Sequence, residues 1–169
     1  MSYLAKHYRA LVLGLLALVV TGLCQAGKPL ELGQTAPDWI LPNAEGQHIS
    51  FYQDSQDHAA VILFWATWCP YCAELMPKLQ DLQQELQGKK VKFYALNVWE
   101  EGDAPGYMAK HGYDFTLLLN ADMVAKRYHV KGTPGLVVVD ADKNLRYLRA
   151  KGTSADDAIT MVKEALKVK

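Results

Sequence analysis

Two cysteines separated by two residues lie where an apolar run meets an amphipathic segment, and this junction restricts the possible folds. The apolar run covers residues 59–65 and carries no charge, which is typical of a strand buried on both faces of a sheet. Residues 71–87 contain leucines at spacings of three and four, which predicts an amphipathic helix. Cys69 and Cys72 are therefore expected at the start of a helix that directly follows a buried strand.

The start of a helix is a position where a thiolate is stabilised. The first backbone N–H groups of a helix lack partners within the helix and carry a partial positive charge. Pro70 suits this first turn because no amide donor is needed there. Cys72 follows nearly one turn later and can reach the Cys69 sulfur. We therefore expect a redox-active disulfide, in which Cys69 attacks the substrate as a thiolate and Cys72 resolves the mixed disulfide.

Two structural interpretations of the cysteine pair are weaker. A disulfide between Cys69 and Cys72 closes a very short loop, so it gains little chain entropy and stabilises the fold only slightly. A zinc site needs further cysteine or histidine ligands. The histidines beyond residue 26 are scattered along the sequence: His48, His58, His111 and His129. No metal is expected, and the lack of a glycine-rich phosphate loop argues against an organic cofactor.

The N-terminus differs in composition from the rest of the chain. Lys6 and Arg9 precede an apolar run from residue 10 to residue 20, and small residues follow up to Ala26. This pattern predicts a secretory signal peptide at residues 1–26, cleaved after Ala26, and a single domain at residues 27–169. An uncleaved membrane anchor or a lipidated Cys24 are the alternatives. The whole chain has 18 basic and 18 acidic residues, so there is no basic excess to indicate nucleic-acid binding.

The remaining segments alternate between strand and helix patterns, which predicts an α/β fold with a mixed central sheet. A short hairpin is expected before the core strand, with residues 39–41 and 47–51 as its strands. Further strands are expected at residues 91–98, 115–119, 136–139 and 145–149. Helices are expected at residues 103–111, 121–128 and 154–168.

Three motifs resemble one group of proteins. The segment from Phe64 to Cys72, with the sequence FWATWCPYC, resembles the active site of periplasmic thioredoxin-like proteins of the TlpA/ResA/CcmG (DsbE) group. Gly132-Thr133-Pro134 resembles the loop of that fold whose cis-proline lies beside the cysteines, and Ala36-Pro37-Asp38 resembles its entry segment. The resemblance implies a thioredoxin fold with a central mixed β-sheet flanked by helices and an extra N-terminal β-hairpin.

The resemblance also implies roles for residues around the cysteines. Pro134 would be cis and packed against the disulfide, and the backbone of Thr133 would pair with an extended substrate strand. Trp68, Pro70 and Tyr71 would contact the substrate beside the cysteines. Trp65 is expected to belong to the core.

Two positions depart from the family pattern. Leu63 occupies the place of the buried acid that thioredoxin carries in this strand, and Leu75 occupies the place of a glutamate found in many TlpA/ResA-like proteins. Cys72 therefore lacks both familiar proton partners. Glu100 or Glu101, just beyond the predicted strand at residues 91–98, are candidates for proton transfer.

The predicted function is thiol-disulfide exchange with partner proteins in the periplasm, by a monomer that touches the membrane only through a possible N-terminal anchor. The resemblance favours a protein-disulfide reductase that serves cytochrome c maturation or copper-site assembly and draws electrons from an inner-membrane thiol protein. The alternatives are an oxidant that donates its disulfide, and a Cu(I) carrier that uses the same two thiolates. A peroxiredoxin-type peroxidase shares the fold, but its single peroxidatic cysteine lies in a different local pattern.

Overall fold

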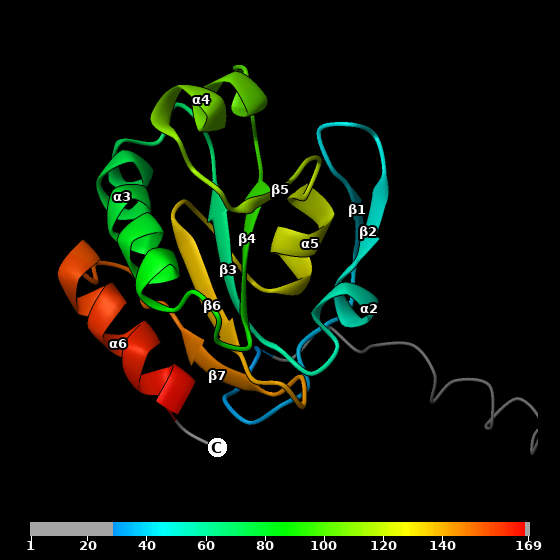
Figure 1. The fold of residues 1–169 in the computed structure, drawn as a ribbon, viewed down its shortest axis with the longest axis vertical. Helices are drawn as coiled ribbons and strands as arrows, with labels where there is room; N and C mark the ends of the chain where they lie inside the picture. Colours follow the sequence, from blue (N-terminus) through cyan, green and yellow to red (C-terminus); the bar gives the residue numbers. More distant parts are fainter. Residues whose placement is uncertain (1–28, 168–169) are drawn as a thin grey trace, which may run out of the picture.

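The computed structural model describes residues 29–167, and the expected signal segment at residues 1–26 lies outside these residues. A five-stranded sheet forms the centre, with strand order β5-β4-β3-β6-β7 (Figure 1). β3, β4 and β5 run parallel, whereas β6 and β7 are antiparallel to their neighbours, so the predicted mixed sheet is confirmed. The strands are β3 (Ala59–Trp65), β4 (Val91–Asn97), β5 (Thr116–Leu118), β6 (Gly135–Val139) and β7 (Leu145–Leu148).

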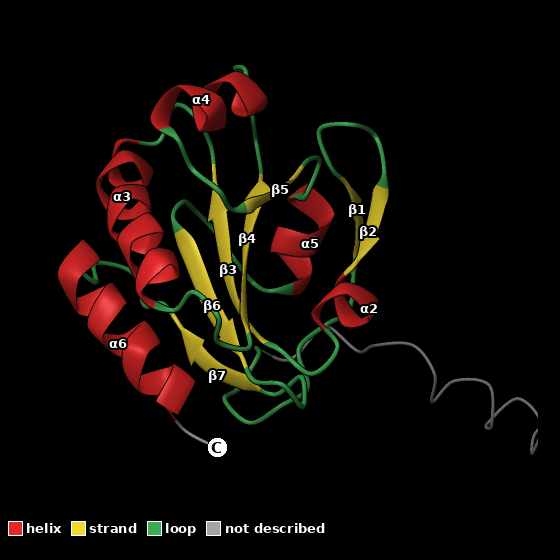
Figure 2. Ribbon diagram, in the orientation of Figure 1, coloured by secondary structure: helices red, strands yellow, loops and turns green. Residues whose placement is uncertain are grey.

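Helices cover both faces of this sheet (Figure 2). α3 (Pro70–Glu85) and α6 (Ala155–Lys167) lie side by side on one face. α5 (Asp122–Arg127) lies on the other face, next to the hairpin of β1 (Ile40–Pro42) and β2 (His48–Ser50) and the short α2 (Phe51–Ser55). α4 (Ala104–His111) lies near the end of the sheet at which α3 begins. No helix within residues 29–167 is long and apolar enough to cross a membrane.

Side-chain alternation along β3 divides the interior into two cores. Val61, Leu63 and Trp65 belong to the core beneath α3 and α6. Ile62 and Phe64 belong to the second core, which α5 and the hairpin cover. Because successive strand residues point to opposite faces, a strand covered on both sides must be apolar at every position. This requirement explains the uninterrupted apolar run that the sequence shows at residues 59–65.

The predicted N-terminal hairpin is confirmed, but its second strand is shorter than expected. β2 ends at Ser50, and Phe51 begins α2 instead of continuing the strand. The Phe51 amide donates to the Trp39 carbonyl, and its ring stacks on Trp39 at a centroid distance of 4.9 Å. Ser55 Oγ donates to the Phe51 carbonyl at 2.6 Å. Burial of the Phe51 ring thus turns the chain into a helix that the alternating pattern at residues 47–51 did not indicate.

Candidate active site

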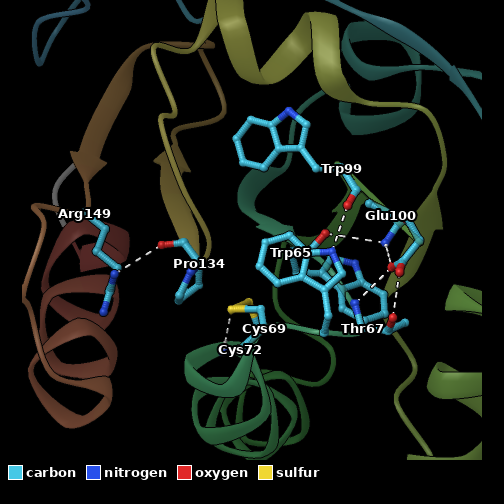
Figure 3. The surroundings of a disulfide bond; sticks show 10 residues. Trp65, Thr67, Cys69, Cys72, Trp99, Glu100, Pro134 and Arg149 are labelled. Carbon is cyan, nitrogen blue, oxygen red and sulfur yellow. Dashed lines mark hydrogen bonds between the residues drawn. A yellow bond between two sulfur atoms is a disulfide. The ribbon is translucent and has the colours of Figure 1, made fainter. Parts of the chain in front are cut away.

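Cys69 and Cys72 form a disulfide at the first turn of α3 (Figure 3). Cys69 is the N-cap residue with an extended backbone, at φ −86° and ψ 109°, and Pro70 occupies the first helical turn. The backbone amide of Cys72 donates to Cys69 Sγ at 3.2 Å. Cys69 Sγ therefore accepts a hydrogen bond from one of the backbone amides at the start of the helix. A negative charge on this sulfur strengthens that hydrogen bond.

The two sulfurs lie at the edge of the core, between exposed aromatic rings. Cys69 and Cys72 are only 3% and 1% exposed, whereas Trp68 and Tyr71 are 52% and 66% exposed. Trp68 Nε1 donates to the carbonyl of Trp99 at 2.8 Å, which fixes the orientation of the Trp68 ring. Both rings are therefore exposed enough for the substrate contact that the resemblance implies, while Trp65 is fully buried, as expected.

The loop before β6, which contains Pro134, lies next to the cysteines (Figure 3). The Thr133–Pro134 peptide bond is cis, as the resemblance implied. Arg149 Nη1 donates to the Pro134 carbonyl at 3.1 Å, and Arg149 Nη2 donates to the Thr153 carbonyl. Arg149 therefore ties the cis-proline loop to the segment between β7 and α6, a contact that the sequence did not indicate.

Glu100 lies on the opposite flank and accepts five hydrogen bonds. Its donors are the amide and hydroxyl of Thr67, the Asn97 side chain, and the amides of Glu101 and Gly102. Burial by itself raises the pKa of the Glu100 carboxyl. The hydrogen bonds from the side chains of Thr67 and Asn97 and from the Thr67 and Gly102 amides outweigh burial and lower the pKa to about 2. A carboxylate so saturated with donors stays ionised at neutral pH and is a poor proton acceptor for Cys72.

This geometry argues against Glu100 as the candidate for proton transfer, whereas the candidacy of Glu101 stays a prediction. Glu100 instead joins the strand ends of β3 and β4, because Thr67 follows β3 and Asn97 ends β4. Glu101 is exposed and contributes only its backbone amide to Glu100. Sequence reasoning missed Asn97, which is 4% exposed. The position of this polar residue at the end of a largely apolar strand was the sequence signal that could have indicated a role for it.

Two buried leucines share the core cluster of Cys72. Leu63 and Leu75 are each almost completely buried and belong to the same core cluster as Cys69 and Cys72. Neither of these two positions therefore supplies Cys72 with a carboxylate.

A groove with a volume of about 970 Å³ opens beside the disulfide. Its walls come from the first turns of α3, the segment from the end of α5 through the cis-proline loop, and the segment between β7 and α6. Pro29 and Leu30, at the start of the described residues, complete the lining. Tyr71, Thr133 and Pro134 line it, so three of the residues expected to bind substrate share one surface. The sequence did not indicate the cationic residues of this groove, which are Lys131, Arg149 and Lys151.

Comparison with known proteins decides the family. The AhpC/TSA family model matches residues 32–148. The chain belongs to the AhpC/TSA family. Over 140 residues this family member is 27% identical to the thiol-disulfide oxidoreductase ResA of Geobacillus thermodenitrificans, covering 82% of this chain and 79% of that protein. A thioredoxin-like protein of Haemophilus influenzae is 30% identical over 104 residues, which is 61% of each chain.

A solved structure agrees with these sequence matches. The crystal structure of a putative thiol:disulfide interchange protein DsbE from Chlorobium tepidum superposes with a TM-score of 0.71 at 25% identity, covering 80% of this chain and 98% of that one. The AhpC/TSA member described here is therefore a protein thiol-disulfide oxidoreductase of the ResA/DsbE-like kind, with the predicted thioredoxin fold. Within residues 29–167, no three His, Cys, Asp or Glu side chains gather as metal ligands.

Proposed function

We propose that this oxidoreductase reduces disulfides in exported client proteins, with Cys69 as the attacking sulfur and Cys72 as the resolving one. The observation that carries the proposal is the position of Cys69. It caps α3, accepts the Cys72 amide at 3.2 Å, and lies beside the cis Thr133–Pro134 bond. A thiolate at this N-cap is stabilised by the helix amides before reaction and is the better nucleophile at neutral pH.

The exchange proceeds in two displacements. The Cys69 thiolate attacks one sulfur of the client disulfide, a new Cys69–client bond forms, and the other client sulfur leaves as a thiolate. Cys72 then loses its proton and attacks Cys69 Sγ, which releases the second client thiolate and forms the Cys69–Cys72 disulfide. Two electrons pass from the oxidoreductase to the client, and the two client thiolates take up protons from solvent.

The client approaches through the groove beside the disulfide. Because Cys69 is only 3% exposed, a client must lie directly against the surface around it. In the described part of the chain, the backbone groups of Lys131, Gly132 and Thr133 take part in no hydrogen bond with other backbone groups. They are free to pair with an extended client segment, while Trp68, Pro70 and Tyr71 contact its side chains.

Export, direction and electron source belong to the same proposal. The N-terminal pattern of the sequence supports export to the periplasm, and the names of the similar proteins support thiol-disulfide exchange. An inner-membrane thiol protein then regenerates the dithiol after each turnover. Cytochrome c maturation and copper-site assembly are the processes that the resemblance favours for the clients.

Replacement of each cysteine tests the mechanism. Cys69→Ala should abolish the reduction of insulin disulfides, because the attacking sulfur is lost. Cys72→Ala should accumulate mixed disulfides with clients, which mass spectrometry of the trapped adducts identifies. Both variants are made in residues 27–169, in which Cys69 and Cys72 are the only cysteines. Insulin reduction by Cys69→Ala close to the wild-type rate would refute the assignment of the nucleophile.

The direction of electron flow is tested by the reduction potential. A reductant should show a potential more negative than about −200 mV when equilibrated with glutathione buffers, whereas a disulfide donor of the strongly oxidising type lies near about −120 mV. A reduction potential near about −120 mV would reverse the proposed direction of electron flow and leave the roles of the two cysteines unchanged.

A further inference from the structure

The groove beside the disulfide has an unequal distribution of charge. Three cationic side chains, Lys131, Arg149 and Lys151, line it, and Glu74 is its single acidic residue. The whole sequence has 18 basic and 18 acidic residues, so it carries no excess of positive charge. The positive charge of this groove is therefore a local feature of the surface beside Cys69.

Two of these cations have no partner among residues 29–167. Neither Lys131 nor Lys151 forms a side-chain hydrogen bond or a salt bridge there, and both are exposed. Several other lysines are paired, as Lys78 is with Asp156 at 2.7 Å and Lys92 with Asp54 at 2.9 Å. Arg149 is held by carbonyls on both of its Nη atoms. The groove thus offers a fixed guanidinium and two unpaired ammonium groups.

The rest of the groove fits a polypeptide better than a small anion. Its volume of about 970 Å³ is at the upper end of the range of about 300–1,000 Å³ that is usual for ligand sites. Tyr71, Leu75 and Leu148 supply apolar walls. The backbone groups of residues 131–133, which pair with no other backbone group in the described chain, supply donors and acceptors along one edge. A groove of this kind matches an extended segment with alternating side chains.

We propose that the groove selects client segments that carry Asp or Glu next to the reacting cysteine. This inference rests on the proposed function and adds a substrate class to it. The cysteine of the client meets Cys69, its backbone runs along residues 131–133, and its acidic side chains meet Lys131 and Lys151. Opposite charges at a partly open site accelerate encounter and orient the client, and both effects weaken as salt screens them.

Synthetic peptides test the charge preference. Three peptides of one length, each with one internal disulfide, differ only in residues beside the cysteines, which are Glu, Gln or Lys. Pre-reduced protein should reduce the Glu peptide about three- to tenfold faster than the Gln peptide at low ionic strength, and the Lys peptide more slowly than either. High salt should bring the three second-order rate constants together.

Variants assign the preference to the two lysines. Combined Lys131→Gln and Lys151→Gln should bring the Glu-to-Gln rate ratio close to one, and combined Lys131→Glu and Lys151→Glu should make the Lys peptide the fastest. Combined Lys89→Gln and Lys110→Gln is the matched control. These two lysines are exposed, have no side-chain partner among residues 29–167 and lie outside the groove, so the ratio should stay at its wild-type value.

The outcomes separate this inference from the function on which it rests. Equal rate constants for the Glu and Gln peptides with the wild-type protein would overturn the acidic-client inference and leave the exchange mechanism standing. A preference for Glu that survives both lysine replacements would also overturn it. Failure to reduce any of the peptides, or insulin, would refute the proposed reductase function and the inference together.

Discussion

The two flanks of the disulfide carry opposite charge and differ in how that charge is used. On one flank, Glu100 accepts five hydrogen bonds from Thr67, Asn97 and the loop that follows it. On the other flank, Lys131 and Lys151 line a groove without partners in the described chain. Both flanks lie close to the cysteines in the fold. The carboxylate is already saturated by the protein, whereas the ammonium groups are available to something else.

Hydrogen-bond saturation is therefore a better guide to function at this site than charge or proximity. A buried or half-buried ion that has all its partners stabilises the fold, and removing it leaves donors unsatisfied. An exposed ion without partners contributes little to stability and can interact with a ligand at small cost. We expect the Glu100 flank to determine stability and the lysine flank to determine client choice.

The largest effect on stability is expected from Glu100→Gln. This change removes the negative charge and directs an amide toward a cluster of donors, so it should lower the free energy of unfolding by about 2–3 kcal/mol. Urea denaturation followed by tryptophan fluorescence measures the loss. Glu101→Gln is the matched control, one residue further along an exposed loop, and should change stability by less than about 0.5 kcal/mol. Equal effects of the two changes would remove the distinction between the flanks.

The pH dependence of stability gives a second, smaller effect on the same flank. Because the pKa of Glu100 falls from 4.5 to about 2 on folding, its charge stabilises the folded state above pH 4.5. That contribution decreases as the pH falls from 4.5 toward 2. Allowing for partial exposure, we expect about 1–2 kcal/mol. Urea titrations of wild type and Glu100→Gln should therefore converge at low pH, and a constant difference down to pH 2 would contradict this.

Trp68 contacts the Glu100 flank through the carbonyl of Trp99 and should show an intermediate effect. Trp68→Phe removes the Nε1 hydrogen bond to the Trp99 carbonyl, so stability should fall by at most about 1 kcal/mol. The freed ring should also reduce kcat/KM for client peptides by a few-fold. Tyr71→Phe is the control, because no hydrogen bond of its hydroxyl is present among the described residues. A larger stability loss for Tyr71→Phe would show that the rim is held differently.

The smallest effect on stability is expected on the lysine flank. Lys131→Gln should change the free energy of unfolding by less than about 0.5 kcal/mol, because the ammonium group has no partner to lose. Thermal unfolding followed by circular dichroism is sufficient to measure this. A loss above about 1 kcal/mol would mean that Lys131 has a structural role and would weaken its assignment to client binding.

Local patterns predicted most of the secondary structure, and the exceptions have tertiary causes. The bounds of β3 and of α4 match the residues expected, since a continuous apolar run and an Asp103 cap are local signals. α2 was missed because Phe51 enters the core beside Trp39, and that burial depends on a partner from another segment. Glu100 was expected to move protons, but its partners Thr67 and Asn97 come from two different strand ends.

The sequence by itself determined the chemistry, because Cys69, Pro70 and Cys72 are neighbours whose roles depend on one strand-to-helix junction. A redox pair at a helix start follows from local spacing and needs no distant contact. Only the tertiary structure decided what surrounds that pair. Lys131 and Lys151 line one groove because β6 pairs with β7, and Glu100 reaches Thr67 because β3 pairs with β4. Whether each charged side chain has a hydrogen-bond partner depends on these tertiary contacts, which local sequence patterns do not predict.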